Sequence, residues 1–176
     1  MSTTSSSDLC LKCGICCDGT AFGQAVLENK DLNTATQQIS LLDKEGKRIL
    51  KLPCQALSDC SCTIYANRPK VCATYECILL KQYINGKVTE SIAHQTIHRV
   101  KSIREEIETQ LKETGNENQK EDIHARMRDF ERDLLTRMPP VEYRQLHGPL
   151  LLKYKVLQKL LIDRFGVQFK SEKSSQ

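Results

Sequence analysis

The segment that decides the fold is Cys10-Leu-Lys-Cys13-Gly-Ile-Cys16-Cys17, which places four thiols within eight residues. Two residues separate Cys10 from Cys13, and two separate Cys13 from Cys16. This spacing lets successive thiolates converge on one metal while backbone amides point at the sulfurs. The segment therefore predicts metal binding near the beginning of the chain.

A second run of cysteines follows about 36 residues later. It reads Cys54-x5-Cys60-x-Cys62-x9-Cys72-x4-Cys77. Folding has to bring the two runs together, and we expect each run to supply part of a shared site. The entropic cost of closing the intervening loop grows only slowly with its length, and thiolate–metal bonds can offset it.

The compartment is inferred from the cysteines and from the N-terminus. The tail Met1–Ser7 is polar and rich in Ser and Thr, without the basic start and apolar segment of a secretory signal. We therefore expect the reducing cytoplasm, where structural disulfides are rare and clustered cysteines are typical of metal ligands or redox thiols. The odd total of nine cysteines also fits poorly with a complete set of intrachain disulfides.

The residues leave the type of metal site open. Eight thiolates can build two tetrahedral zinc sites of four ligands each, or a binuclear cluster with bridging thiolates. Adjacent Cys16 and Cys17 can serve different metals or bridge two. Cys10, Cys13 and Cys16 also match the first three ligands of a bacterial ferredoxin run, although the fourth cysteine followed by proline is missing at that spacing. Zinc is slightly favoured over iron.

The first run, together with Cys62-Thr-Ile-Tyr-Ala-Asn-Arg-Pro-Lys-Val-Cys72 and Cys77, resembles the YkgJ-like family of CxxCxxCC proteins, described as zinc- or iron-chelating. The resemblance covers roughly residues 8–80. It leaves Cys60 outside the ligand set, and this chain has Ala73 where the family often has arginine. The eight metal-binding cysteines that the resemblance implies are Cys10, Cys13, Cys16, Cys17, Cys54, Cys62, Cys72 and Cys77.

Beyond a turn at Asn85–Gly86 the hydrophobic pattern becomes helical, with apolar residues three and four positions apart. Three amphipathic helices follow, ended by Gly115, by Pro139–Pro140 and by Gly166. Their apolar stripes are Ile97, Val100, Ile103, Ile107 and Leu111; Ile123, Met127, Phe130, Leu134 and Met138; and Tyr154, Leu157, Leu161 and Phe165.

The predicted fold is mostly α, with a small irregular cysteine-rich module stabilised by metal and a helical hairpin or three-helix appendage. We expect a disordered tail over 1–7, the metal-binding domain over 8–84, the appendage over 85–167 and a loose tail over 168–176. Within the module, short strands are expected at 22–27 and 48–52, the second after a turn at 43–46. Residues 31–42 are ambiguous and are assigned to a helix, and 53–77 to turns with one short helix.

Other side chains are weaker candidates. Glu90, His94 and His98 share one helix face, but that face lies opposite the apolar stripe and is expected to be solvated. Glu121-x2-His124 resembles half of a di-iron motif whose second copy is missing, so helix surface is expected there. Arg68, between two cysteines, is a candidate donor that tempers thiolate charge.

Composition excludes some partners. The chain carries 26 basic and 22 acidic residues, net +4, which is too mild to indicate a nucleic-acid partner. The C-terminal region is basic, and we interpret this as a solvated helix face. No run of 18 apolar residues predicts a membrane helix.

These patterns predict a metal-binding cysteine-cluster protein, holding zinc, iron or an iron–sulfur cluster, that acts as a structural or interaction module. An unidentified protein partner would contact its helical region. The alternative is an iron–sulfur cluster-dependent enzyme or a redox or metal sensor. A thiol oxidoreductase is less favoured, because no βαβ pattern accompanies Cys10-x2-Cys13. No substrate or reaction follows from the residues.

Overall fold

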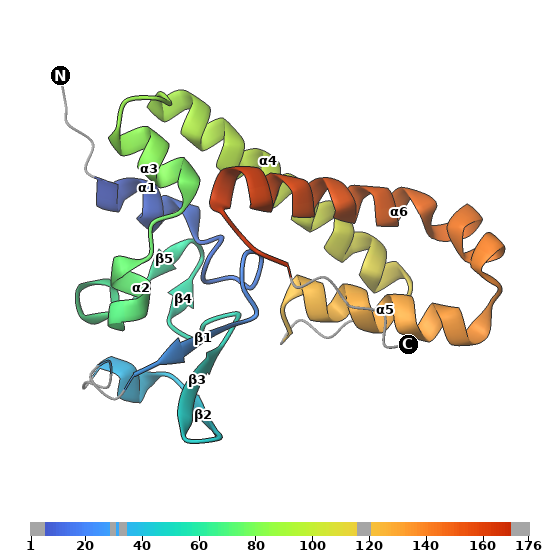
Figure 1. Ribbon diagram of the computed structural model, residues 1–176, viewed down its shortest axis with the longest axis horizontal. Coiled ribbons are helices and arrows are strands. Elements are labelled where there is room, and N and C mark those ends of the chain that lie inside the picture. Colours follow the sequence, from blue (N-terminus) through green and yellow to red (C-terminus); the bar gives the residue numbers. More distant parts are fainter. Residues whose placement is uncertain (1–5, 29–30, 32–34, 116–120, 170–176) are drawn as a thin grey trace.

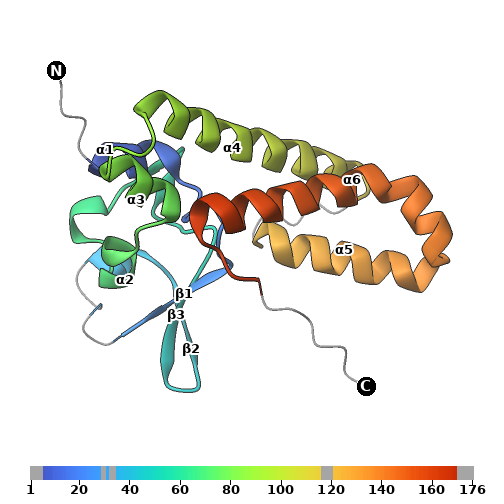
Figure 2. The ribbon, with the colours of Figure 1, turned by 45° about the horizontal axis from the view of Figure 1, so that its top comes forward.

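The computed structural model describes residues 6–28, 31, 35–115 and 121–169. A region of short helices and small sheets lies at one end, and three long helices extend away from it (Figures 1 and 2). The described elements are α1 (Ser6–Cys13), β1 (Gln24–Leu27), η2 (Ala35–Gln38), β2 (Leu41–Lys44), β3 (Lys47–Lys51), β4 (Leu57–Ser58), β5 (Ser61–Cys62), η3 (Tyr65–Asn67), α2 (Lys70–Thr74), α3 (Ile78–Ile84), α4 (Glu90–Glu113), α5 (Ile123–Arg137), α6 (Pro140–Leu160) and the π-helical turn η4 (Leu161–Phe165).

The prediction of a mostly α chain with a small irregular part is confirmed in outline. The three long helices are α4, α5 and α6, and the predicted apolar stripes lie on their buried sides, the third stripe continuing from α6 into η4. The ends also agree, because Gly115 and Gly166 adopt the left-handed conformation just after α4 and η4. Among the described helices, none is both long and apolar enough to cross a membrane.

The predicted helix over 31–42 is wrong where the structure describes this segment. Ala35–Gln38 forms one 3-10 turn, and β2 begins at Leu41. β2 pairs with β3, with Leu41 opposite Leu50, through a two-residue turn at Glu45–Gly46 in which both residues have positive φ. β1 pairs with the other edge of β3, giving the order β1-β3-β2. Strand pairing therefore overrides the local helical preference.

Two helices of the cysteine-rich part were not predicted. α1 carries Cys10 and Cys13, and α3 begins immediately after Cys77. The predicted strands and the short helix between Pro53 and Cys77 are confirmed as β1, β3 and α2, and the small hairpin β4–β5 is additional. The predicted tail over 1–7 lies outside the described residues except for Ser6 and Ser7 in α1, and the tail over 168–176 lies outside them except for Gln168 and Phe169.

The larger core runs through both parts of the chain. Leu9, Ile15 and Ala21 from the cysteine-rich part pack in one cluster with buried residues of α3, α4, α5, α6 and η4. A smaller core lies under the three-stranded sheet and consists of Leu27, Ile39, Leu50, Leu52, Ala56 and Ile64. The predicted domain boundary at 84/85 coincides with a turn, but the larger core continues across it. Independent folding of the two parts stays a prediction.

The beginning of α5 rests on the loop that follows the first cysteine run. Asp122 caps α5, because its Oδ1 accepts hydrogen bonds from the amides of His124 (3.0 Å) and Ala125 (2.9 Å). Gly23 lies directly against this carboxylate, so a Cβ on Gly23 would be 2.5 Å from Asp122 Oδ2 and 2.9 Å from its Cγ. The absence of a side chain at residue 23 is therefore what allows the cap to form.

We expect Gly23→Ala to destabilise the protein by about 1–3 kcal/mol, because the added methyl group displaces the capping carboxylate. The matched control is Gly148→Ala inside α6, where an added Cβ would meet nothing within 4 Å. That change should stabilise by about 0.5–1 kcal/mol through helix propensity. Urea unfolding of both variants measures the difference. Equal effects of the two substitutions would contradict this account of Gly23.

Candidate metal centre

The first cysteine run combines a helix and a turn. Cys10 and Cys13 are three residues apart in α1 and so share one face of that helix. α1 ends at Cys13, and Gly14, with φ of 71°, reverses the chain. The amide of Cys17 then donates to the Gly14 carbonyl at 2.8 Å, which fixes the turn that carries the double cysteine.

The second run reaches the first by backbone and side-chain contacts. The Cys54 amide donates to the carbonyl of Cys17 at 2.7 Å. Cys62 lies in β5 and Cys72 in α2. Cys77 caps α3, and its Sγ accepts a hydrogen bond from the Leu80 amide at 3.3 Å.

The thiols fall into two neighbourhoods, and we name the first of them set one. The pKa of Cys13 is raised to about 12, mainly by burial and in smaller part by the charges of Cys77 and Cys10. Burial likewise raises the pKa of Cys16, with added contributions from Cys13, Cys77, its chain neighbour Cys17, and Cys10. Cys13, Cys16 and Cys77 also pack against the larger core. Set one therefore consists of Cys10, Cys13, Cys16 and Cys77.

The second neighbourhood, set two, is centred on Cys17. The pKa of Cys17 is raised to about 12, mainly by burial and in smaller part by the charges of Cys54, Cys72 and Cys62. The pKa of Cys72 is raised to about 11, again mainly by burial, with smaller contributions from Cys54 and Cys62. Cys54 and Cys62 pack against the smaller core. Set two therefore consists of Cys17, Cys54, Cys62 and Cys72.

Cys60 has different surroundings. Its Sγ accepts a hydrogen bond from Lys101 Nζ of α4 at 2.8 Å, and the same ammonium lies 3.5 Å from the carbonyl of Lys12. The Cys60 backbone packs over Gly14, whose added Cβ would be 3.4 Å from the Cys60 Cα. Cys60 thus helps to join α1, the β4–β5 hairpin and α4.

The donor set fits a soft metal. Four thiols in each neighbourhood match tetrahedral zinc and the ligands of an iron–sulfur cluster. Within the described ranges, no three His, Cys, Asp or Glu side chains are already arranged to hold a metal ion. Metal binding would therefore have to draw the thiols together, and it would displace their protons because the ligands are thiolates.

Arg68 lies close to both sets. Its guanidinium stacks on the Tyr65 ring with Cζ 3.7 Å from the centroid, and Nη1 donates to the Tyr65 carbonyl at 2.5 Å. Burial raises the pKa of both Cys10 and Cys72, and the positive charge of Arg68 opposes that rise at each thiol. The role of Arg68 in tempering the charge of metal-bound thiolates stays a prediction.

The histidines considered as weaker candidates differ in their exposure to solvent. His98 is exposed and His94 lies 3.6 Å from Glu90 on the same partly exposed face, as predicted. The prediction that His124 lies on the helix surface is wrong, because its side chain is buried. Its Nε2 lies 2.8 Å from the carbonyl oxygen of Thr20 and its Nδ1 lies 2.9 Å from the Tyr154 hydroxyl. These partners make His124 a contact between the cysteine loop and two helices.

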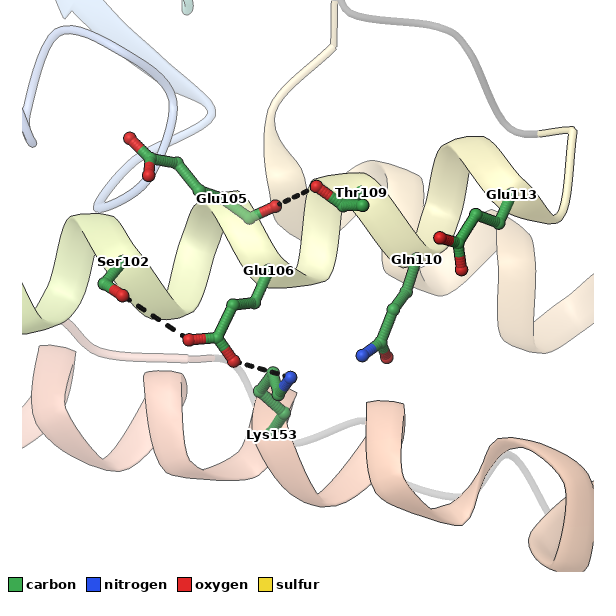
Figure 3. Close-up of a pocket in the computed structure, with 7 residues that line it drawn as sticks. All are labelled: Ser102, Glu105, Glu106, Thr109, Gln110, Glu113 and Lys153. Atoms are coloured by element: carbon green, nitrogen blue, oxygen red, sulfur yellow. Dashed lines mark hydrogen bonds and ion pairs between the residues drawn. The ribbon is translucent and has the colours of Figure 1, made fainter.

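A groove between α4 and α6 differs from the cysteine-rich region in the residues that line it (Figure 3). It has a volume of about 350 Å³ and is lined by hydroxyl, amide and acidic side chains of α4 together with Lys153. Lys153 Nζ lies 2.6 Å from Glu106 Oε2, and Ser102 donates to Oε1 of the same carboxylate at 3.4 Å. No cysteine is among its lining residues, so it is separate from the thiol sets.

Because His124 is buried, we expect the stability of the folded protein to depend on pH. Burial lowers its pKa below the ordinary value of 6.5, so the unfolded chain binds the proton more readily. The stability that neutral His124 contributes is therefore present above about pH 6.5 and is lost as the pH falls, by up to about 1.4 kcal/mol per pH unit. Urea unfolding at pH 7.5, 6.5 and 5.5 should show a shallower loss for His124→Gln than for the unmodified chain.

His98→Gln is the control for this experiment, since His98 is exposed on α4. Its pH profile should follow that of the unmodified chain. If the free energy of unfolding fell equally with pH for His124→Gln and for the unmodified chain, His124 would not be the cause of the pH dependence.

The cysteine-rich part matches a known family model. The model CxxCxxCC, described as "Putative zinc- or iron-chelating domain", matches residues 9–105, more than half of the 176-residue chain. The match includes all nine cysteines and extends into α4. No curated protein and no solved structure gives a significant match. The family description supports metal binding, and the chain belongs to the CxxCxxCC family.

Proposed function

We propose that this protein binds zinc or iron through eight of its cysteines, and that the bound metal stabilises the cysteine-rich part of the fold. The observation that carries the proposal is the gathering of eight partly buried or exposed thiols, from both cysteine runs, into two neighbourhoods. Cys60 is excluded because its thiol is paired with Lys101.

A structural role for the metal is supported by the limited apolar packing and short strands of the cysteine-rich part. The smaller core contains few residues, and the β4 and β5 strands have two residues each. Small modules of this kind need metal or disulfide cross-links in addition to apolar burial. Structural zinc supplies folding free energy directly, with apparent values of about 10–16 kcal/mol in small zinc peptides.

The proposed role as an interaction module concerns the helices. α6 exposes Val141, Leu146 and Leu152, each with more than half of its side-chain surface accessible. Under this proposal, these exposed side chains would be among those that contact a protein partner. The metal would then hold the fold from which α6 is presented.

The second candidate function is that of an iron–sulfur protein, acting as an enzyme or a redox or metal sensor. The ferredoxin-like spacing of Cys10, Cys13 and Cys16 lacks its local fourth ligand, but Cys77 is their neighbour in set one. Backbone amides near Cys13 and Cys77 lower the pKa of thiols that burial raises. Such N–H groups also help to stabilise a cluster.

The metal itself is identified by anaerobic purification followed by elemental analysis and an absorption spectrum. Zinc without visible absorption supports the first function. Iron and sulfide with a broad visible band support the second. A protein without either metal, in both the purified and the reconstituted form, would contradict metal binding.

We expect metal removal to abolish hydrogen-exchange protection first in β1 to β5 and α2, because these elements have the smaller core. Protection in the middle of α4 and α6 should persist longer, since those helices share the larger core. Chelation followed by amide exchange and mass spectrometry measures the order, and restored protection after zinc is returned is the control. Unchanged protection in the strands would contradict a structural role for the metal.

We expect Cys60→Ser to keep the full metal content, and Cys62→Ser to lose a substantial part of it. The two residues lie on the same hairpin, so they are matched in position but differ in their surroundings. Elemental analysis of the purified variants gives the metal content per chain. Loss of metal from Cys60→Ser together with retention in Cys62→Ser would reverse the ligand assignment.

A further inference from the structure

We propose that the eight thiols form two separate four-thiolate metal centres, one from set one and one from set two, with the chain passing from one centre to the other between Cys16 and Cys17. This deepens the proposed function and rests on it. The competing arrangement is one binuclear cluster in which thiolates bridge the two ions. The ions suited to each centre are soft divalent cations that accept four sulfur ligands, such as Zn²⁺ or its probes Co²⁺ and Cd²⁺.

Packing separates the two sets. Cys13, Cys16 and Cys77 lie against the larger core, while Cys54 and Cys62 lie against the smaller core under the sheet. A bridging cluster would require thiols of both sets to surround a shared pair of ions. The two cores instead hold their thiols on different apolar supports.

Backbone contacts account for set one. Cys10 and Cys13 are on successive turns of α1, and α1 lies beside α3 in both views (Figures 1 and 2). Cys77 is the residue that caps α3, so this helix pair brings it toward the thiols of α1. Cys16 follows within the turn that begins at Gly14.

Other backbone contacts account for three members of set two, Cys17, Cys54 and Cys62. The amide of Cys54 is bonded to the carbonyl of Cys17, which fixes Cys17 beside the second cysteine run. The Leu57 amide donates to the Cys54 carbonyl at 3.0 Å, and Leu57 pairs with Cys62 across the β4–β5 hairpin. Cys54 and Cys62 are therefore held at the base of one hairpin.

The test uses the full chain, stripped of metal under reducing conditions and loaded with ¹¹³Cd²⁺ alone. We expect two cadmium NMR signals in the range of four-thiolate sites, without ¹¹³Cd–¹¹³Cd coupling. Cys16→Ser should lose or shift one signal strongly, and Cys17→Ser the other, although the substitutions are at adjacent residues. Cys10→Ser should match Cys16→Ser, Cys72→Ser should match Cys17→Ser, and Cys60→Ser should keep both signals.

The unmodified chain already discriminates between the arrangements, so the test does not depend on the folding of any variant. Cadmium–cadmium coupling through shared sulfur, or one signal for both ions, would overturn the two-centre proposal while leaving metal binding intact. A chain that binds no cadmium would instead contradict the proposed function. Every single-cysteine variant disturbing both signals equally would also overturn the separate centres.

Discussion

The close contact between the loop after Cys17 and the first turn of α5 is the constraint on which the arrangement of the two parts depends. Gly19 and Gly23 both lie against Asp122, and an added Cβ on Gly19 would be 3.2 Å from the Asp122 Cα. Thr20 is fully buried, and its carbonyl lies within hydrogen-bond distance of His124. The segment that follows the double cysteine is therefore also the surface on which the helical hairpin is placed.

Charged side chains reinforce this contact. Arg104 of α4 lies 2.6 Å from Asp18 and 2.9 Å from Glu108, and Glu108 lies 3.5 Å from Arg126, which is only 1% exposed. Charges removed from water are costly unless they are paired, so removing one carboxylate would leave a poorly compensated guanidinium. Asp18 follows Cys17 directly, which connects the thiol-bearing turn to the helices through ion pairs as well as packing.

The sequence predicted the long helices well because each is amphipathic over several turns, as with Ile97, Val100 and Leu111 of α4. It did not predict α1 and α3, since these helices are short and their periodicity is weak. The first two residues of β2, Leu41 and Leu42, were wrongly assigned to a helix because their strand conformation depends on pairing with Leu50 and Ile49 across the ladder. The spacing of the cysteines in the sequence indicated both cysteine runs. It did not indicate which thiols lie near one another, because Cys17 and Cys54 are distant in sequence and meet through a backbone hydrogen bond.

Because α4 is long, a small tilt at its first turn would displace its far end considerably. Its 24 residues make a rod of about 36 Å, and the family match ends within it, at residue 105. The first part of this rod lies with the cysteine-rich elements, while its far end supports α5 and α6 (Figure 1). A tilt of about 5° at the first turn would displace the far end by about 3 Å. A rearrangement among the thiols that tilted α4 would therefore displace its far end more than its first turn.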